Sequence, residues 1–310
     1  MDFVRTPWLD SHRRAVTPLA KRLLYRLARP LLGARARRAL SPEFLAAVRP
    51  DLVLYTRGMP REHRLAWASR GLDLRRATVL VQGTGTGWDV LAWAALRPAR
   101  IIATDLFDFP ESWGPIAAHC AATYGVEVTF RAAPLEDHAF LPAGSVDLCA
   151  SDAVFEHCRD LPAVLAETRR LLRPGGRVYA GYGPLWCAPG GDHFSGRGGA
   201  EHLYDHVLLD PEPYRAYFEA HRREPEDFQS GGRYVELDLF SRLTTREYLD
   251  AFAAAGFARD GLIVEVSPAA ERFRLAHPRE WQRLLVRLHP RVGADDLAVR
   301  AHLVRLRAPG

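Results

Sequence analysis

The chain has 310 residues, of which 48% are hydrophobic and 25% are charged, as in a globular protein that buries a full core. No apolar run approaches the roughly 18 residues that a membrane span needs, and the N-terminal residues lack signal-peptide features. We therefore expect a cytoplasmic protein without a membrane span. The formal net charge is +5, but acidic residues are interspersed among the basic ones, which argues against a nucleic-acid partner.

The N-terminal part contains one basic amphipathic segment, between residues 12 and 38. Leucines recur there at helical spacing, opposite a set of arginines. These leucines are Leu19, Leu23, Leu24, Leu27 and Leu31. One interpretation is a helix that packs its leucines on the core or over the active site, and the other is a helix for a membrane surface or an acidic partner. We treat residues 1–76 as an N-terminal helical extension.

From Ala77 onward, short β-branched runs alternate with helical patterns, which predicts an α/β fold with a mostly parallel, seven-stranded sheet and helices on both faces. The predicted strands cover residues 78–82, 100–104, 126–131, 146–151, 177–182, 262–266 and 302–306. Predicted helices cover residues 88–96, 112–124, 161–172, 245–255 and 278–288. Thr244 and Glu247 form a capping-box pattern at the start of the fourth of these helices.

Residues 183–243 do not follow this alternation. They are rich in glycine, proline, histidine and aromatic residues, and connections longer than about 12–15 residues are usually functional lids or binding loops. We therefore predict an inserted substrate-binding cap after the fifth strand. The expected organisation is an N-terminal extension (1–76), a cofactor-binding core (77–182), the cap (183–243) and a C-terminal completion of the core (244–310).

The most informative stretch is VLVQGTGTGW, over residues 79–88, where a predicted strand enters a glycine-rich turn and a helix leaves it. Gly83, Gly85 and Gly87 permit a tight turn and a close approach of the backbone to a ligand. Asp105 ends the next strand, where a carboxylate can accept both hydroxyls of a ribose. The spacing G-x-G-x-G brings the third glycine one residue earlier than in dinucleotide-binding loops, which suits a ligand without a phosphate.

These motifs resemble the class I S-adenosylmethionine-dependent methyltransferases of the type 11-like group, of the kind acting on sugars or natural products. VLVQGTGTG matches their first motif and TDL around Asp105 matches their ribose-binding acid. SVDLCASDAVFEHCRDLPAVLAETRRLLRPGGRVY is similar to their fourth strand, the following helix and the fifth strand, and LTTREYLDAFAAAGF to the segment before their sixth strand. The resemblance implies a Rossmann-like fold and S-adenosyl-L-methionine as the cofactor.

The resemblance also implies a set of cofactor-binding residues. They are Gly83, Thr84, Gly85, Gly87, Asp105, Leu106, Leu135, Glu136 and Asp152. Two positions depart from the family pattern. Val81 stands where the family usually carries an acid, and the turn after the third strand reads AAPLED, so the adenine contact is expected at Leu135 or Glu136.

Methyl transfer from a sulfonium requires alignment of the nucleophile, exclusion of water and, often, removal of a proton from the acceptor. His157 follows the fourth strand and His193 follows the fifth, and an imidazole suits a general base. Asp192, beside His193, would orient that imidazole. A structural role for either histidine, ordering its loop, is the alternative.

Three residues near the cap are expected to face the methyl acceptor: Tyr182, Trp186 and His202. The run GPLWCAPGGDH is similar to stretches in methyltransferases that act on sugars or natural products. His193, His202 and His206 also raise the possibility of a metal site. Isolated loop histidines are more often surface or pocket residues, so we predict no metal.

The leading functional prediction is methylation, most readily on oxygen, of a polar or sugar-containing small molecule in secondary metabolism. The alternatives are a degenerate binding protein on the same fold and a Rossmann oxidoreductase. An oxidoreductase is expected to have the longer glycine spacing of dinucleotide-binding loops. RNA methylation is less favoured because no RNA-binding module or localised basic groove is visible. The oligomeric state is not predicted.

Overall fold

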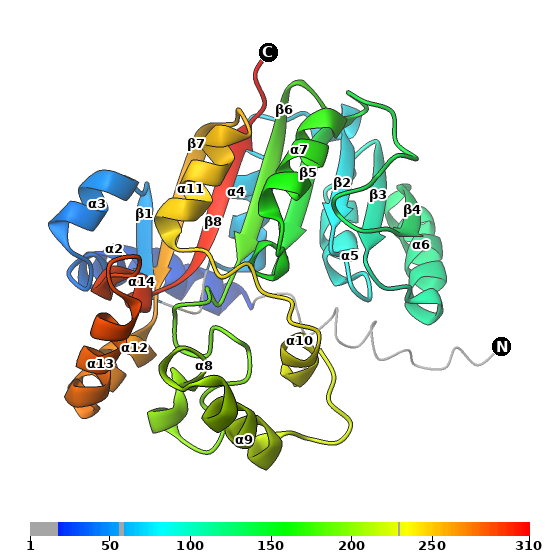
Figure 1. Cartoon of the computed structure of the whole chain (residues 1–310). Helices are drawn as coiled ribbons and strands as arrows, with labels where there is room; N and C mark the ends of the chain where they lie inside the picture. Colours follow the sequence, from blue (N-terminus) through cyan, green and yellow to red (C-terminus); the bar gives the residue numbers. More distant parts are fainter. Residues whose placement is uncertain (1–17, 56–58, 229) are drawn as a thin grey trace.

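The computed structural model describes residues 18–55, 59–228 and 230–310 (Figure 1). Its centre is an eight-stranded sheet with the strand order β1-β7-β8-β6-β5-β2-β3-β4. β8 runs antiparallel to both of its neighbours, β6 and β7, and the other neighbouring pairs are parallel. The predicted α/β, Rossmann-like class with a mostly parallel sheet is thereby confirmed.

The strands are β1 (Leu52–Tyr55), β2 (Thr78–Gln82), β3 (Arg100–Asp105), β4 (Glu127–Ala132), β5 (Val146–Asp152), β6 (Leu172–Tyr182), β7 (Ala258–Val266) and β8 (Val299–Arg307). The principal helices of the core are α2 (Leu19–Arg37), α3 (Pro42–Val48), α4 (Arg61–Ala68), α5 (Trp88–Ala94), α6 (Pro110–Tyr124), α7 (Leu161–Leu171) and α11 (Thr245–Ala254). Three further helices follow β7: α12 (Pro268–Ala276), α13 (Pro278–Leu288) and α14 (Ala294–Ala298).

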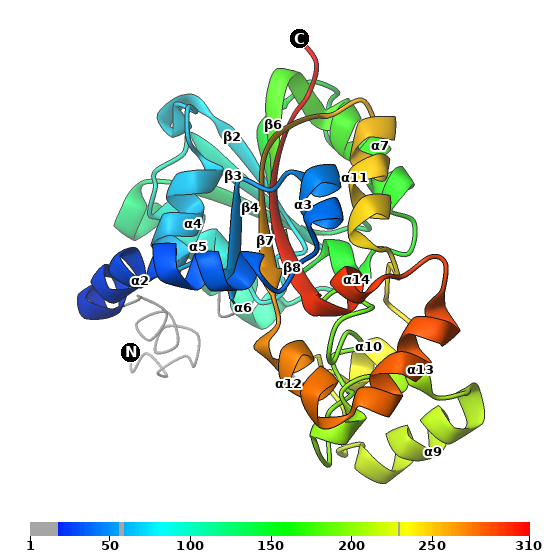
Figure 2. The same ribbon diagram turned by 90° about the vertical axis from the view of Figure 1, so that its left-hand side faces the viewer.

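Helices cover both faces of the sheet. α4, α5 and α6 pack on one face and α3, α7 and α11 on the other, as Figure 2 shows edge-on. Side chains of β2 alternate between the two layers, because successive residues of a strand point to opposite faces. Val79 and Val81 join one apolar cluster and Leu80 joins the other, and all three are buried. Burial on both faces explains why this strand is a continuous apolar run.

The sequence prediction missed one strand. β1 lies inside the expected helical extension and pairs in parallel with β7, with Val53 and Leu54 buried. The sheet therefore has eight strands and not seven. A run of four apolar residues shows no period long enough to separate a strand from the start of a helix, which is why the pattern did not reveal β1.

Helix α2 turns its leucines away from the core. Leu24, Leu27 and Leu31 are 65%, 78% and 77% exposed, so the interpretation that these leucines pack on the core is wrong. The helix instead approaches β1 through two small residues, Gly33 and Ala36, both of which are buried. None of the helices within the described ranges is both long and apolar enough to cross a membrane.

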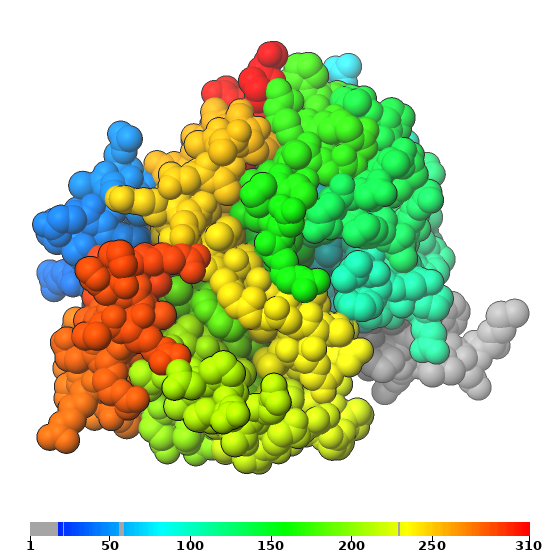
Figure 3. All heavy atoms as spheres, viewed as in Figure 1, coloured from blue at the N-terminus to red at the C-terminus, as the bar shows by residue number. Residues whose placement is uncertain are grey.

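The segment between β6 and α11, residues 183–243, is called the cap below. It contains three short helices, α8 (Asp205–Leu208), α9 (Pro211–His221) and α10 (Gly232–Glu236). In Figures 1 and 3 the cap, coloured from green to yellow, lies below the core and in contact with it. Tyr204 of the cap packs against Phe273 of α12 and Trp281 of α13, which ties the cap to the C-terminal helices.

Candidate active site

A cavity of about 730 Å³ lies where the carboxyl ends of β2, β3 and β5 meet the cap. Ligands of open α/β sheets bind at this edge, and small-molecule sites span roughly 300–1,000 Å³. Six predicted cofactor-binding residues line its core side: Gly83, Gly85, Asp105, Leu106, Leu135 and Glu136. The cap contributes Asp227, Phe228, Tyr234 and Leu239 to the opposite side.

The glycine loop is closely packed on one side and open on the other. Gly83, Gly85 and Gly87 all have positive φ angles, of 66°, 50° and 97°. A Cβ at Gly83 would lie 2.3 Å from a methyl carbon of Val154, whereas a Cβ at Gly85 would meet nothing within 4 Å. The loop therefore rests on the segment after β5 and presents its backbone at Gly85 to the cavity.

The Asp105 carboxylate is fixed toward this loop. One carboxylate oxygen accepts a hydrogen bond from the Gly85 amide at 2.7 Å, and the other accepts one from the Phe107 amide at 3.0 Å. Burial raises the pKa of Asp105, and hydrogen bonds from the backbone amides of Phe107, Gly85 and Leu106 oppose that rise. A carboxylate can accept about four hydrogen bonds, so these amides do not exhaust its capacity to bind a hydroxyl of a ligand.

Three of the predicted cofactor residues lie outside the cavity wall. Thr84 is buried, and its amide donates to Thr104 at 3.0 Å, while Gly87 precedes the first turn of α5. Asp152 accepts a hydrogen bond from the Tyr179 hydroxyl at 2.7 Å and lies 3.4 Å from the Arg64 guanidinium. Burial raises the pKa of Asp152 to about 7, and Arg64 opposes that rise. This ion pair could not be predicted from a local pattern, because Arg64 comes from the N-terminal extension.

His157 lies in a short 3-10 turn, Phe155–His157, directly after β5, and lines the cavity. Its Nδ1–H donates to the carbonyl of Leu239 at 2.8 Å, and its ring stacks on Tyr234 with 4.0 Å between the centroids. The other ring nitrogen, Nε2, carries the lone pair and has no hydrogen-bond partner among the residues that the structure describes. Burial lowers the pKa of His157 to about 4, so this imidazole is neutral at pH 7.

His193 reaches the same place from the cap. Its ring centroid is 4.8 Å from that of His157, and burial lowers its pKa to about 3. Glu156 completes the group: one carboxylate oxygen accepts from the Gly183 amide at 2.8 Å, and burial raises the pKa of this acid to about 8. Single ligand atoms of Glu156, His157 and His193 all lie within 4.8 Å of one another. These three residues are called the Glu-His-His cluster below.

Asp192 does not orient His193, which corrects the sequence expectation. It accepts hydrogen bonds from the amides of Phe194 and Ser195, at 3.1 and 2.7 Å. It also accepts from the hydroxyls of Ser195 and Tyr214, at 2.8 and 2.5 Å. Aspartate readily bonds the backbone two or three residues ahead, so its carboxylate closes this turn of the cap.

The three residues expected to face the acceptor lie elsewhere. Tyr182 is buried against Phe155 and Tyr248, Trp186 packs on Phe240, and His202 bonds Asp205 at 2.7 Å. Tyr182 therefore belongs to the core, Trp186 and His202 are half-buried in the cap, and none of the three is among the residues that line the cavity.

The histidines of the expected metal group, His193, His202 and His206, are likewise not gathered. His202 bonds Asp205, and the imidazole of His206 bonds the carbonyl of Trp186 at 2.7 Å.

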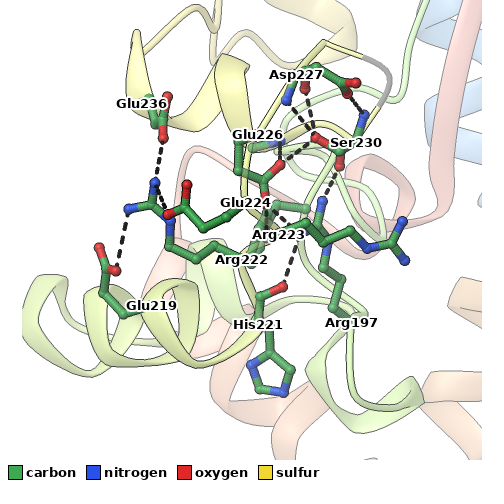
Figure 4. A network of polar contacts seen from close by, with 12 residues as sticks. Arg197, Glu219, His221, Arg222, Arg223, Glu224, Glu226, Asp227, Ser230 and Glu236 are labelled. Carbon is green, nitrogen blue, oxygen red and sulfur yellow. Dashed lines mark hydrogen bonds and ion pairs between the residues drawn. The ribbon is translucent and has the colours of Figure 1, made fainter.

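The cap residues of the cavity wall were not found from the sequence. Phe228 and Tyr234 pack on each other, with 5.0 Å between their ring centroids, and Phe228 also contacts Phe107 of the core. A polar network holds the loop that carries Phe228 (Figure 4). In this network the Arg197 guanidinium donates to the Glu226 carboxylate at 2.8 Å. Burial would raise the pKa of Glu226, but the hydrogen bonds from Arg197 and Ser230 outweigh it and lower this pKa to about 2.

Comparison with known proteins identifies the central part of the chain. Residues 80–180 match the family model described as "Methyltransferase domain". A ubiquinone biosynthesis O-methyltransferase of Xanthomonas oryzae pv. oryzae is 33% identical over 120 residues, which is 37% of this chain and 47% of that protein. An uncharacterized 37.1 kDa protein of a Streptomyces fradiae transposon is 32% identical over 180 residues, 55% of this chain and 48% of that protein. The chain thus spans about half the length of these curated relatives.

Among solved structures, an S-adenosylmethionine-dependent methyltransferase from Mesorhizobium loti matches with a TM-score of 0.47 and 19% identity, covering 79% of this chain and 96% of that one. The matched family region contains the glycine loop, Asp105 and the turn that carries His157. Residues 80–180 of the chain thus form a methyltransferase domain.

Proposed function

We propose that this chain transfers the methyl group of S-adenosylmethionine to an oxygen atom of a small polar molecule. One observation carries the proposal: a single cavity extends from Asp105, at the glycine loop, to His157 and Tyr234, under the cap. A ligand pair can therefore occupy one continuous space, with the cofactor against the core and the acceptor against the cap. A sugar-bearing metabolite of secondary metabolism is the acceptor class that we favour.

In this proposal the cofactor lies along the core side of the cavity. Asp105 accepts hydrogen bonds from the two ribose hydroxyls, and the loop from Gly83 to Gly87 faces the amino-acid end. Leu135 and Glu136 lie on the same wall and would contact the adenine. The methyl group then points to the remaining part of the cavity, between the segment after β5 and the cap.

The acceptor would lie against the cap side. The rings of Phe228 and Tyr234 offer flat apolar surfaces for the face of a sugar or another ring. Arg159 and Asp227 line the same space and can bond hydroxyl groups of a polar acceptor. This mixture of ring surfaces and polar groups supports a small hydroxylated molecule over a large apolar one.

The proposed reaction is an in-line displacement. The acceptor oxygen bonds to the methyl carbon while the carbon–sulfur bond breaks, and its electron pair stays on the sulfur of S-adenosylhomocysteine. The acceptor proton leaves at the Glu-His-His cluster, where His157 Nε2 presents an unprotonated nitrogen near the cavity. Alignment of the two reactants in one cavity supplies most of the acceleration, because little covalent machinery is needed.

Each part of the chain has its own role in this proposal. Residues 77–182 and 244–310 would form the cofactor-binding core, residues 183–243 the acceptor-binding cap, and residues 1–76 an extension that adds β1 to the sheet. Both parts of the proposal require the cap and the core to act together.

The direct test measures release of S-adenosylhomocysteine from S-adenosylmethionine over a panel of glycosides, sugars and phenols, with a radiolabelled methyl group to identify the product. Asp105→Asn is the matched loss-of-binding control. Calorimetric titration of NAD beside S-adenosylmethionine tests the oxidoreductase alternative. Tight binding of NAD would overturn the proposal, and so would binding of S-adenosylmethionine without turnover across the whole panel.

A further inference from the structure

The Glu-His-His cluster contains three buried polar atoms without partners. Glu156 Oε2, His157 Nε2 and His193 Nε2 each lack a hydrogen bond to any part of the chain that the structure describes. Leaving a buried acceptor unsatisfied costs about 1–3 kcal/mol, and more when the group is charged. Each of the three residues also offers one ligand atom within 4.8 Å of those of the other two, so a bound group that satisfies the unpartnered atoms explains them better.

The other atoms of two of these groups are already engaged. Leu239 accepts from His157 Nδ1–H, and Glu156 Oε1 accepts from the Gly183 amide. These bonds fix the imidazole tautomer of His157 and one oxygen of the Glu156 carboxylate, and they leave His157 Nε2 and Glu156 Oε2 available to a ligand. Metal-binding histidines and carboxylates are oriented by outer hydrogen bonds of this kind.

We infer that Glu156, His157 and His193 bind one divalent transition-metal ion of the zinc class, with an open coordination position toward the cavity. Two imidazole nitrogens and one carboxylate oxygen form a ligand set found in catalytic zinc sites, which keep a fourth position for water or substrate. Magnesium and calcium prefer oxygen ligands and are less suited to two imidazoles. Metal–ligand distances of about 2.0–2.2 Å require the cluster to contract by small side-chain rotations.

This inference rests on the proposed methyl transfer and gives the cluster its chemical role. The acceptor hydroxyl would take the open position, where the cation lowers its pKa, as it does for bound water. The hydroxyl proton passes to solvent, and the resulting oxygen anion bonds to the methyl carbon as the carbon–sulfur bond breaks. With the ion bound, His157 Nε2 is a metal ligand and no longer accepts the proton as in the metal-free scheme above, and the cation acidifies the acceptor hydroxyl.

The position of the ligands adds a consequence independent of activity. Glu156 and His157 follow β5 of the core, whereas His193 belongs to the cap. An ion bound by all three would link the cap to the core and stabilise the folded chain, because a ligand that binds only the native state shifts the unfolding equilibrium. Thermal unfolding therefore reports on the site without any substrate.

The experiment uses the full chain, freed of metal by a chelator and titrated with Zn²⁺ by calorimetry and with Co²⁺ by visible absorption. We expect one ion per chain, a Co²⁺ spectrum of low coordination number and a higher unfolding temperature with Zn²⁺. His193→Ala should weaken binding roughly a hundredfold or more and abolish the thermal shift. His119→Gln, on α6, should leave both unchanged.

Binding of S-adenosylmethionine, measured in the same samples, separates the two proposals. Retained cofactor binding and chelator-resistant methyl transfer, without a specific ion, would overturn the metal site and leave the methyltransferase proposal standing. Equal metal affinity in the His193→Ala and parent proteins would also overturn the site. Methyl transfer lost on chelation and restored by Zn²⁺ in the parent, but not in His193→Ala, would support it.

Discussion

Replacing Asp105 with asparagine is expected to weaken binding of S-adenosylmethionine roughly a hundredfold without unfolding the chain. The carboxylate is only 9% exposed and is held in place by the amides of Gly85 and Phe107, so it is aligned before the cofactor arrives. Two ribose hydroxyls donating to a charged acceptor contribute about 1.5 kcal/mol each at the lower end of the usual range. A loss of about 3 kcal/mol corresponds to roughly two decades in Kd.

Isothermal titration with S-adenosylmethionine and S-adenosylhomocysteine measures this change. The asparagine side chain keeps an oxygen that can accept from the Gly85 amide, so the loop should hold its shape, and thermal unfolding checks that it does. Asp108→Asn, at an exposed position three residues further on, is the matched control and should bind normally. An unchanged Kd for Asp105→Asn, or an equal loss in both variants, would refute the assignment of Asp105 to the ribose.

Three further predictions concern the loop, the cap and the core. Gly83→Ala should lower the free energy of unfolding by about 2–4 kcal/mol, because the new Cβ would overlap the Val154 side chain. Gly85→Ala should lower it by only about 1 kcal/mol, because at this position only the backbone is strained. Equal losses in urea unfolding would contradict that packing. Tyr234→Ala should raise the KM for the acceptor at least about tenfold while the Kd for S-adenosylmethionine stays constant, because this ring lines the cap side of the cavity. A change in the Kd for S-adenosylmethionine alone would contradict the assignment of Tyr234 to the acceptor. His302 is buried between Tyr182 and Tyr248, and burial lowers its pKa to about 3. The imidazole therefore stays neutral in the native state, whereas in the unfolded chain it takes up a proton near its ordinary pKa of 6.5. The contribution of His302 to stability is therefore present above pH 6.5, and the free energy of unfolding falls by about 2 kcal/mol on this account between pH 7 and pH 5. His302→Gln should remove this loss. An identical pH dependence of unfolding in the parent and the variant would contradict the prediction.

Local patterns predicted the fold well wherever a strand or helix carries its own signal. The capping box is formed as expected, with the Glu247 amide donating to the Thr244 hydroxyl and the Thr244 amide donating to the Glu247 carboxylate. β2 and the glycine loop were recognisable because a buried parallel strand is an uninterrupted apolar run. β1 was missed because its four residues gain their strand conformation from pairing with β7, two hundred residues away in the chain, and not from their own pattern.

In the candidate site, too, residues of local sequence motifs could be predicted and residues placed by long-range packing could not. The glycine loop and Asp105 belong to short motifs whose geometry is set by adjacent strands, so their place in the cavity wall could be predicted. Phe228 and Tyr234 come from a cap without periodicity, and their orientation depends on long-range packing and on the Arg197 network. Adjacency in sequence was misleading for Asp192, whose carboxylate closes a backbone turn and bonds Tyr214.

A crystal structure of the chain with S-adenosylhomocysteine tests the central claim most directly. The account predicts both ribose hydroxyls within hydrogen-bonding distance of the Asp105 carboxylate, the adenine beside Leu135, and the sulfur facing the part of the cavity closed by His157 and Tyr234. A nucleoside bound outside this cavity, or bound with its ribose away from Asp105, would contradict it.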